Sequence, residues 1–464
     1  MRFNRLVGGC LLVQPFFLCA SQAQQVRHVQ QQTTDGAVEG VVSADDKVRT
    51  FKGIPYAAPP VGTLRWRAPE PVVAWTAVRQ AVEYPQRCMQ GPPPPGMTFG
   101  DSGPSEDCLY LSLWMPAHPD VAKLPVMLWI NGEQFAAGST SEPRQDAGNL
   151  SKKGVLVVSF NYRLGIFGFL AHPELAKESP SHASGNYGFL DQIAALRWLK
   201  KNIASFGGDP DNITIFGAGS GSISVSALMA SPLARGLFQH AIGQGGACLS
   251  EDNSFRSRAD AERISLGFEK AALGSTSVEV LRASSAEALL DAALKQPAGT
   301  FSPDIDGEFL PNSCAEIYRS GNQSHVPLLA GWDKNQSANS AMESARVWVD
   351  LQSKTGTSVV YSYEFDQSLP HAENSRQAYP ALRDLPEIEF VFRVLSSKQL
   401  PWKPEDATYR RRSLPIGLIS RRQAIPTALA CRSGRVTRAR PKLTPSISEC
   451  LSSTEESSAF MSDG

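Results

Sequence analysis

The chain alternates short apolar runs with segments that carry apolar residues at helical spacing. Residues 126–130 and 155–160 are continuous apolar runs bounded by turn residues, a pattern typical of strands buried on both faces of a parallel sheet. Residues 190–206 carry apolar side chains at helical spacing and precede the helix-ending sequence G-G-D-P at 207–210. The pattern predicts strands and helices in alternation, with the strands in a parallel sheet.

A glycine-rich turn, G-A-G-S-G-S at residues 217–222, follows another predicted strand at 213–216 and precedes an Ala/Ser/Leu-rich helix. This layout is typical of a site-bearing crossover in α/β proteins. A dinucleotide-binding loop does not fit, because its third glycine is Ser222 and no acidic residue lies between positions 211 and 251 to hold a ribose. A nucleophile elbow, G-x-S-x-G, fits the spacing, but its central position holds Gly219.

Composition and charge narrow the class of protein. The 464 residues include 45 Lys and Arg and 45 Asp and Glu, and this balance argues against a nucleic-acid-binding protein. Hydrophobic residues make up 42% of the chain and charged residues 19%, enough for a large core and incompatible with wholesale disorder. Beyond the N-terminus there is no apolar stretch of about 18 residues, which excludes a multi-span membrane protein.

The N-terminus predicts a targeting segment. Two arginines precede an apolar run at residues 6–20, and the run is followed by S-Q-A, which suits cleavage after Ala23. A membrane anchor fits less well, because Gln14 and Pro15 interrupt a run that is already short. We therefore expect residues 1–23 to be a signal peptide, the mature protein to be secreted or periplasmic, and no membrane span to remain after cleavage.

Export implies an oxidising compartment, which favours disulfides. Two of the eight cysteines leave with the signal peptide. Cys88 and Cys108 flank a Pro/Gly-rich loop that a disulfide between them could close. The sequence fixes no pairing for the others, Cys248, Cys314, Cys431 and Cys450.

Several motifs resemble those of the type-B carboxylesterases, the α/β-hydrolase family that includes the cholinesterases. They are F-K-G-I-P-Y-A at 51–57, S-E-D-C-L at 105–109, N-Y-R-L-G at 161–165, F-G-G-D-P at 206–210 and E-I-E-F-V-F at 387–392. The similarity runs from about residue 35 to 336 and resumes from about 345 to 406. It implies an α/β-hydrolase fold, with a central, mostly parallel sheet flanked by helices on both faces, and it supports Cys88–Cys108 as the family's first loop disulfide.

The resemblance breaks down at the catalytic positions. This fold hydrolyses esters with a serine nucleophile, a histidine that moves its proton and a carboxylate that orients the histidine. The family's serine position is Gly219, its acid position is Gln336 and its histidine position is Asp384. His371 is the only nearby alternative base, and an exposed loop histidine is the simpler interpretation of it.

The family's oxyanion segment H-G-G-G-F is replaced by N-G-E-Q-F at residues 131–135. Glu133 and Gln134 therefore stand where glycines allow special backbone conformations, and Glu133 adds a negative charge near the place where negative charge develops. Ser220 occupies a position whose N–H is an oxyanion donor in the family. Because its neighbours are small, Ser220 is also a candidate displaced nucleophile.

The C-terminal half departs further from the family. The acid and histidine positions are only 48 residues apart, so a block of the family's sequence is missing near residues 337–345. We expect one hydrolase domain at 24–408 and a basic, disordered tail at 409–464, because residues 410–440 hold nine Arg and no Asp or Glu. The tail's composition resembles an out-of-frame read, and a basic interaction tail is the alternative.

These observations predict a carboxylesterase-family protein with a degraded active site and no metal or organic cofactor. Its expected ligand is a small carboxylic ester or an ester-like molecule, with no nucleic-acid partner. Three functions stay open: an inactive or severely impaired esterase, an active esterase that uses Ser220, and a noncatalytic ligand-binding or adhesion protein.

Overall fold

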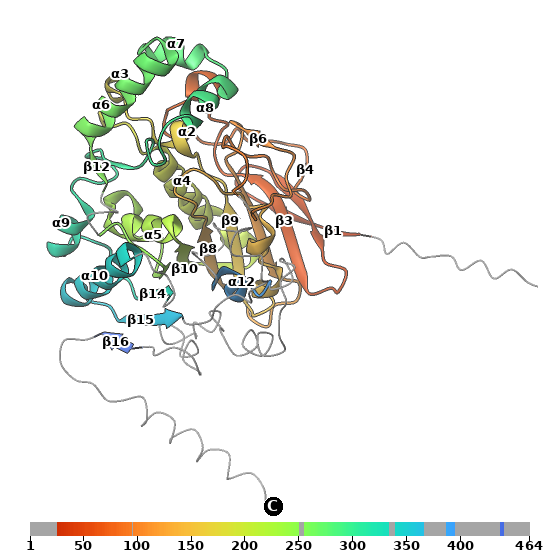
Figure 1. Cartoon of the computed structure of the whole chain (residues 1–464). Helices are drawn as coiled ribbons and strands as arrows, with labels where there is room; N and C mark the ends of the chain where they lie inside the picture. Colours follow the sequence, from red (N-terminus) through yellow and green to blue (C-terminus); the bar gives the residue numbers. More distant parts are fainter. Residues whose placement is uncertain are drawn as a thin grey trace, which may run out of the picture.

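The computed structural model describes residues 26–94, 96–249, 255–333, 339–365, 387–394 and 437–439, which form one layered α/β architecture (Figure 1). The strands of its large sheet follow one another in this spatial order: β1 (Arg27–Gln32), β2 (Ala37–Val42), β3 (Val48–Pro55), β7 (Tyr110–Pro116), β9 (Leu156–Phe160), β8 (Leu124–Ile130), β10 (Gly208–Ala218), β11 (His240–Gln244), β14 (Leu328–Asp333), β15 (Val360–Phe365) and β16 (Thr437–Ala439). Strand β4 (Arg79–Gln80) pairs with β2 outside this path.

The centre of this sheet is parallel. Adjacent strands from β9 through β8, β10, β11 and β14 to β15 pair in parallel, and β1, β2, β3 and β7 add an antiparallel flank. All five residues of β9 are buried, as its continuous apolar sequence predicts. The predicted α/β-hydrolase fold with a mostly parallel sheet is therefore confirmed.

Helices cover both faces, and strand β8 shows why. Because side chains alternate along a strand, Leu128 and Ile130 enter one hydrophobic core, while Met127 and Trp129 enter the other. The first core includes residues of α4 (Tyr187–Asn202), α5 (Ser220–Ala230) and α10 (Asn339–Thr355). The second includes residues of α1 (Gly148–Ser151) and α12 (Glu387–Phe392).

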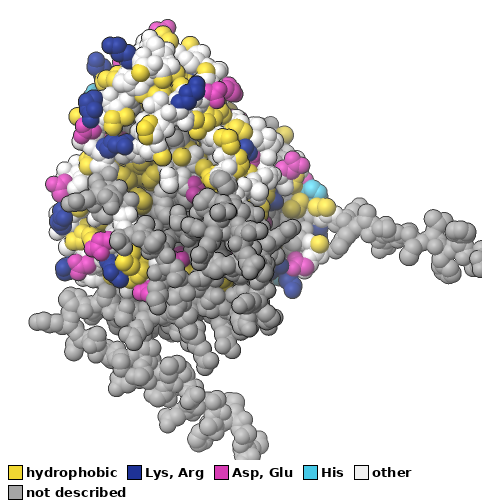
Figure 2. Space-filling view, in the orientation of Figure 1, with side chains coloured by type: hydrophobic (Ala, Val, Ile, Leu, Met, Phe, Trp, Pro, Cys, Tyr) yellow, Lys and Arg dark blue, Asp and Glu magenta, His cyan; other side chains and the backbone are white. Residues whose placement is uncertain are grey.

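A helical lobe lies at the top of the view in Figure 1, where α3, α6, α7 and α8 gather. On the face shown in Figure 2 its hydrophobic side chains are interspersed with charged ones. The remaining helices are α2 (Gly165–Phe169), α3 (Pro173–Glu178), α6 (Arg258–Phe268), α7 (Val278–Ala283), α8 (Ala286–Leu294) and α9 (Cys314–Arg319). Short elements are β5 (Arg87–Cys88), β6 (Pro104–Ser105), β12 (Arg256–Ser257), β13 (Asp304–Ile305), η1 (Gly62–Leu64), η2 (Pro143–Gln145), η3 (Ile203–Phe206), η4 (Pro232–Ala234) and the π-turn η5 (Glu269–Leu273).

Strand β16 lies inside the tail for which the composition predicts disorder. It pairs antiparallel with β15, with Arg438 opposite Tyr361. This pairing satisfies backbone groups that a free edge of β15 would leave exposed. The rest of the tail and the predicted signal peptide lie outside the described residues. In the described part of the chain, no helix is both long and apolar enough to cross a bilayer.

Candidate active site

The turn between β10 and α5 has Gly219 at its apex. Its backbone angles, φ 57° and ψ −123°, lie in a region that favours glycine. The Gly219 N–H donates to the carbonyl of Gln244 at 2.9 Å, and its own carbonyl accepts from the N–H of Ile223 at 3.0 Å. The chain therefore keeps a sharp strand-to-helix turn, and the residue at its apex has no side chain.

The loop after β8 packs directly against this turn. A Cβ atom on Gly132 would lie 2.1 Å from the backbone nitrogen of Gly221 and 2.2 Å from the carbonyl oxygen of Ala218. A Cβ on Gly221 would lie 2.2 Å from the carbonyl oxygen of Ile130. Because no side chain fits at either contact, these two glycines allow the loop and the elbow to meet backbone to backbone.

The same loop contains two residues in the left-handed region. Gln134 has a φ of 55° and Phe135 a φ of 58°, which costs free energy for residues with a Cβ. Phe135 holds the loop at two points. Its N–H donates to Oγ of Ser220 in the elbow at 3.4 Å, and its carbonyl accepts from the N–H of Gly165, the first residue of α2, at 2.8 Å. Gln134 thus adopts, with strain, a conformation that a glycine at this position would adopt freely.

Glu133 has a cationic neighbour. Its Oε1 lies 3.5 Å from Nη2 of Arg144, a buried residue of η2. Arg144 also pairs with Glu142, and its Nη1 lies 3.9 Å from Oε1 of Glu389 in α12. The sequence predicts the carboxylate of Glu133 but not this partner, because Arg144 lies 11 residues further along the chain. The pairing links the loop after β8 to α12 and partly offsets the charge of Glu133.

Ser220 is the first residue of α5 and is only 8% exposed. Its Oγ accepts the hydrogen bond from Phe135, so the hydroxyl oxygen lies against the loop after β8. The structure therefore brings together Gly219, Ser220 and the loop that carries Glu133 and Gln134. The other predicted site residues, Gln336, Asp384 and the alternative base His371, lie outside the described residues.

A buried carboxyl lies beside the elbow strands. Oε1 of Glu387 accepts hydrogen bonds from Nε2 of Gln244 at 2.5 Å and from the hydroxyl of Tyr363 at 2.9 Å. Burial raises the pKa of Glu387 to about 7, and the nearby Asp333 carboxylate also raises it, against the lowering effect of the two hydrogen bonds. Gln244 is also the residue whose carbonyl accepts from Gly219.

The sequence did not predict this network, although most of its residues lie at the ends of buried strands or in a family motif. Gln244 and Asp333 end the buried strands β11 and β14, where polar side chains often serve a site in α/β proteins. Tyr363 lies in β15, and Glu387 belongs to the E-I-E-F-V-F motif. The signals lie far apart along the chain, so only the tertiary structure shows that these residues meet.

The predicted disulfide is present. Cys88 and Cys108 are bonded with an S–S distance of 2.02 Å. Cys248 and Cys314, whose pairing the sequence leaves open, form a second disulfide. Cys431 and Cys450 lie outside the described residues.

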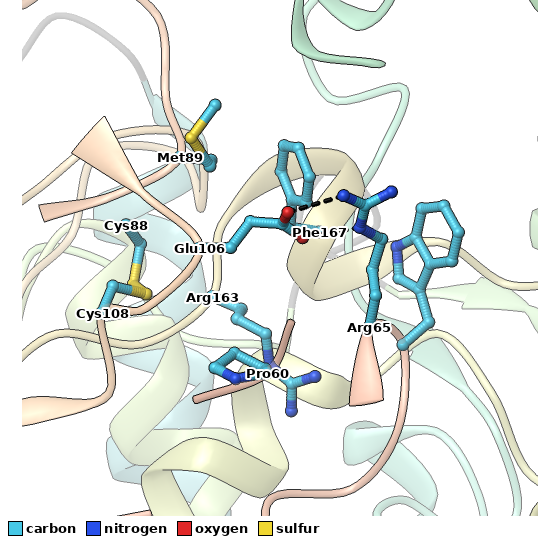
Figure 3. Close-up of a pocket in the computed structure, with 9 residues that line it drawn as sticks. Pro60, Arg65, Cys88, Met89, Glu106, Cys108, Arg163 and Phe167 are labelled. Atoms are coloured by element: carbon cyan, nitrogen blue, oxygen red, sulfur yellow. Dashed lines mark hydrogen bonds and ion pairs between the residues drawn. A yellow bond between two sulfur atoms is a disulfide. The ribbon is translucent and has the colours of Figure 1, made fainter. Parts of the chain in front are cut away.

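The first disulfide borders a cavity in which Arg65 meets Glu106 (Figure 3). The guanidinium donates from Nε and Nη2 to the two carboxylate oxygens, each at 2.6 Å. The volume of about 10 Å³ is that of one water molecule at most, so the cavity does not hold an organic ligand. The Arg65–Glu106 pair and the disulfide therefore fix this loop structurally.

Across the described ranges, no cluster of three or more His, Cys, Asp or Glu side chains has an arrangement that could hold a metal ion.

Comparisons with known proteins agree with this geometry. The carboxylesterase family model matches residues 25–356. The chain is 36% identical over 377 residues to fumonisin B1 esterase of Sphingopyxis macrogoltabida, covering 81% of this chain and 66% of that protein. It is 39% identical over 315 residues to para-nitrobenzyl esterase of Bacillus subtilis, covering 66% of this chain and 62% of that protein.

Solved structures show the same relationship. The fold matches a structure of PNB esterase with a TM-score of 0.72 and 31% sequence identity, covering 82% of this chain and 88% of the other. The chain spans about two thirds of the length of the curated relatives named above. Because the family model covers most of this chain and the fold agrees, the protein belongs to the carboxylesterase family.

Proposed function

We propose that this protein is an exported carboxylesterase-family member that binds small carboxylic esters and hydrolyses them weakly or not at all. One observation carries the proposal. The apex of the elbow is Gly219, so the position that should present an attacking oxygen presents only a hydrogen atom. Removing a triad nucleophile or base costs on the order of 10⁶-fold in turnover, which is most of the rate enhancement of such an enzyme.

Two further features support impaired hydrolysis. Gln134 is strained in the loop that supplies oxyanion donors, and Glu133 places a carboxylate in that loop. Loss of one oxyanion donor typically costs about 10²- to 10³-fold. We also propose that Gln336 stands where the family has its orienting acid and Asp384 where it has its histidine base. Both replacements would further impair hydrolysis.

An active esterase with Ser220 as displaced nucleophile is the second candidate. The observation that favours it is the position of the hydroxyl, one residue past the apex and among small neighbours. Against it, Oγ of Ser220 already accepts the Phe135 N–H. Attack by Ser220 would require a base to take its proton, and neither Gln336 nor Asp384 is a good one.

The third candidate is a noncatalytic ligand-binding or adhesion protein. Such a protein would not hydrolyse esters at all, and its ligand need not be an ester. Binding of an ester can be measured without turnover, for example of phenyl acetate by ligand-detected NMR. Saturable binding of phenyl acetate supports the first proposal. If the folded protein does not bind it, the proposal that the ligand is a small ester is wrong.

The chemistry is tested with p-nitrophenyl acetate hydrolysis and fluorophosphonate labelling. The wild type, Ser220→Ala and Gly219→Ser are compared, with Ser205→Ala as a control because this serine caps the end of α4 through a bond to Asn202. We expect labelling of the wild type at background, unchanged in Ser220→Ala. Labelling that disappears only in Ser220→Ala would establish the displaced nucleophile instead. Activity that appears in Gly219→Ser would show that a base and oxyanion donors survive.

Export is part of the proposal. The two disulfides support it, because such bonds persist mainly in oxidising compartments. Mass spectrometry of protein purified from a secreting host should give a mature N-terminus at Gln24. An intact Met1 in material from the culture medium or periplasm would contradict cleavage after Ala23.

A further inference from the structure

The large sheet has two edges of different character. Strand β1, at one end, has the sequence R-H-V-Q-Q-Q, and all its residues are exposed or partly exposed. Two of its side chains form ion pairs, Arg27 with Asp46 and His28 with Glu39. Polar and charged edge strands of this kind resist pairing with another molecule. The side chains of β1 therefore protect that edge by themselves.

Strand β15, near the other end of the sheet, lacks this protection. Its sequence is V-Y-S-Y-E-F, in which Glu364 is the single charged residue and the aromatic residues favour strands. All six residues pair with β14 on one side of the strand. An open edge of this composition on the other side would be a template for pairing with a second chain.

The tail strand β16 lies on that other side of β15 (Figure 1). It pairs with residues 360–362 in antiparallel register, with Arg438 opposite Tyr361. The sequence around it, R-V-T-R-A-R-P at 435–441, contains three arginines and ends in a proline. Short length, positive charge and proline are features by which natural edge strands avoid further pairing. Strand β16 therefore replaces a longer, almost uncharged edge with a short cationic one.

We propose that β16 is an edge cap that prevents this chain from pairing through β15 with a second copy of itself. The docking surface is the outer edge of β15, and its occupant is the tail strand of the same chain. When the cap is lost, two β15 strands pair antiparallel about a two-fold axis, because an antiparallel pair of identical strands is self-complementary. Loss of the cap therefore converts a monomer into a dimer.

Two prolines in the tail strand test the cap. Thr437→Pro with Arg438→Pro removes at least one backbone donor from the pairing with β15, because alternate N–H groups of an antiparallel strand face its partner. The matched control is Ser433→Pro with Ser446→Pro, which places two prolines in the tail outside β16.

Size-exclusion chromatography with light scattering gives the mass of each full-length protein at about 5 and about 100 µM, since self-association depends on concentration. We expect the wild type and the control to have the mass of one chain at both concentrations. The mass of the strand variant should rise toward about twice that value at the higher concentration. A strand variant that keeps the mass of one chain, or a wild type that is already a dimer, would overturn the proposal.

A charge on β15 assigns the contact surface. Tyr361→Lys, added to the strand variant, places a cation on the edge that two copies share, so that like charges meet when they pair there. Val73→Lys in the same background is the control, because Val73 is 85% exposed and lies outside the strands of the sheet. Only Tyr361→Lys should return the mass to that of one chain. A dimer that persists with Tyr361→Lys would mean that β15 is not the docking surface.

A disulfide shows which copy supplies the cap. Directly opposite residues of an antiparallel pair have Cα atoms about 4.5 to 5.5 Å apart, within the range that a disulfide spans. Tyr361→Cys with Arg438→Cys, in a full-length protein that also carries Cys431→Ser and Cys450→Ser, should therefore form a disulfide within one chain. Non-reducing electrophoresis and peptide mass spectrometry detect this bond. A bond between two chains would overturn a cap made by the same chain. These measurements use no ester and no turnover, so their outcome is independent of the proposed function.

Discussion

The hydroxyl of Tyr363 donates a hydrogen bond to the carboxyl of Glu387, 2.9 Å away in the buried space between β15 and α12. Gln244 donates to the same oxygen, so Glu387 joins strand β11, strand β15 and helix α12. This carboxyl lies three residues after Asp384, which we predict to stand at the family's histidine position. The backbone carbonyl of its partner Gln244 accepts a hydrogen bond from the elbow residue Gly219. Its protonation state is therefore coupled to the structure around the site.

Glu387→Gln should change the pH dependence of stability. The folded state keeps the proton of Glu387 up to about pH 7, whereas the unfolded chain releases it near pH 4.5. The folded state thus binds more protons in this window, and wild-type stability should fall as pH rises from about 4.5 to about 7 and level off above pH 7. A glutamine mimics the neutral carboxyl and removes this dependence.

Over that window the wild type should lose on the order of 3 kcal/mol relative to Glu387→Gln. The measurement is urea unfolding of both proteins at several pH values. Glu364→Gln, a partly exposed carboxylate one residue from Tyr363 on β15, is the control and should give a profile parallel to the wild type. Parallel profiles for Glu387→Gln would show that the carboxyl is ionised throughout.

Gly219→Ala should destabilise the protein. The angles at Gly219 are unfavourable for any residue with a Cβ, at a cost of about 1 to 3 kcal/mol. Gly267→Ala in helix α6 is the matched control, because its Cβ would have open space and its φ is not positive. That change should stabilise by about 0.5 to 1 kcal/mol. Chemical unfolding of both variants tests the contrast, which a destabilisation common to both would contradict.

Arg144→Met should destabilise strongly. The guanidinium is buried and faces Glu133, Glu142 and Glu389, and losing it leaves these carboxylates without their cation. Breaking a buried pair in this way costs about 3 to 5 kcal/mol. The measurement is the free energy of unfolding in urea.

Arg263→Met is the control for this arginine. Arg263 pairs with Asp260 on the exposed side of α6, where its side chain is 71% accessible. Its loss should cost less than about 1 kcal/mol. Equal costs for the two variants would mean that the Arg144 cluster contributes no more than a surface pair.

Removing the two disulfides separately should cost different amounts. Cys88 and Cys108 are separated by 20 positions, and Cys248 and Cys314 by 66. Because a longer loop loses more entropy when it is closed, we expect costs of about 3 and about 4 kcal/mol, respectively. The paired Cys→Ser variants are compared by urea unfolding. A larger cost for the shorter loop would show that packing around Arg65 and Glu106 outweighs chain entropy.

The sequence alone predicts the parallel centre of the sheet, the turn at Gly219 and the pairing of Cys88 with Cys108. These features depend on local signals: continuous apolar runs such as 155–160, a glycine-rich turn between a strand and a helix, and motifs shared with a family. Local signals are readable because hydrophobic periodicity and backbone freedom act over a few residues.

Tertiary structure decided the rest. Arg144 beside Glu133, Gln244 with Tyr363 on Glu387, and Cys248 bonded to Cys314 join segments from different parts of the chain. The tail strand β16 is a further case, because its pairing depends on the free edge of β15 and not on its own composition. Such contacts follow from how strands and helices pack in three dimensions, and neither spacing nor composition encodes which distant side chains will meet.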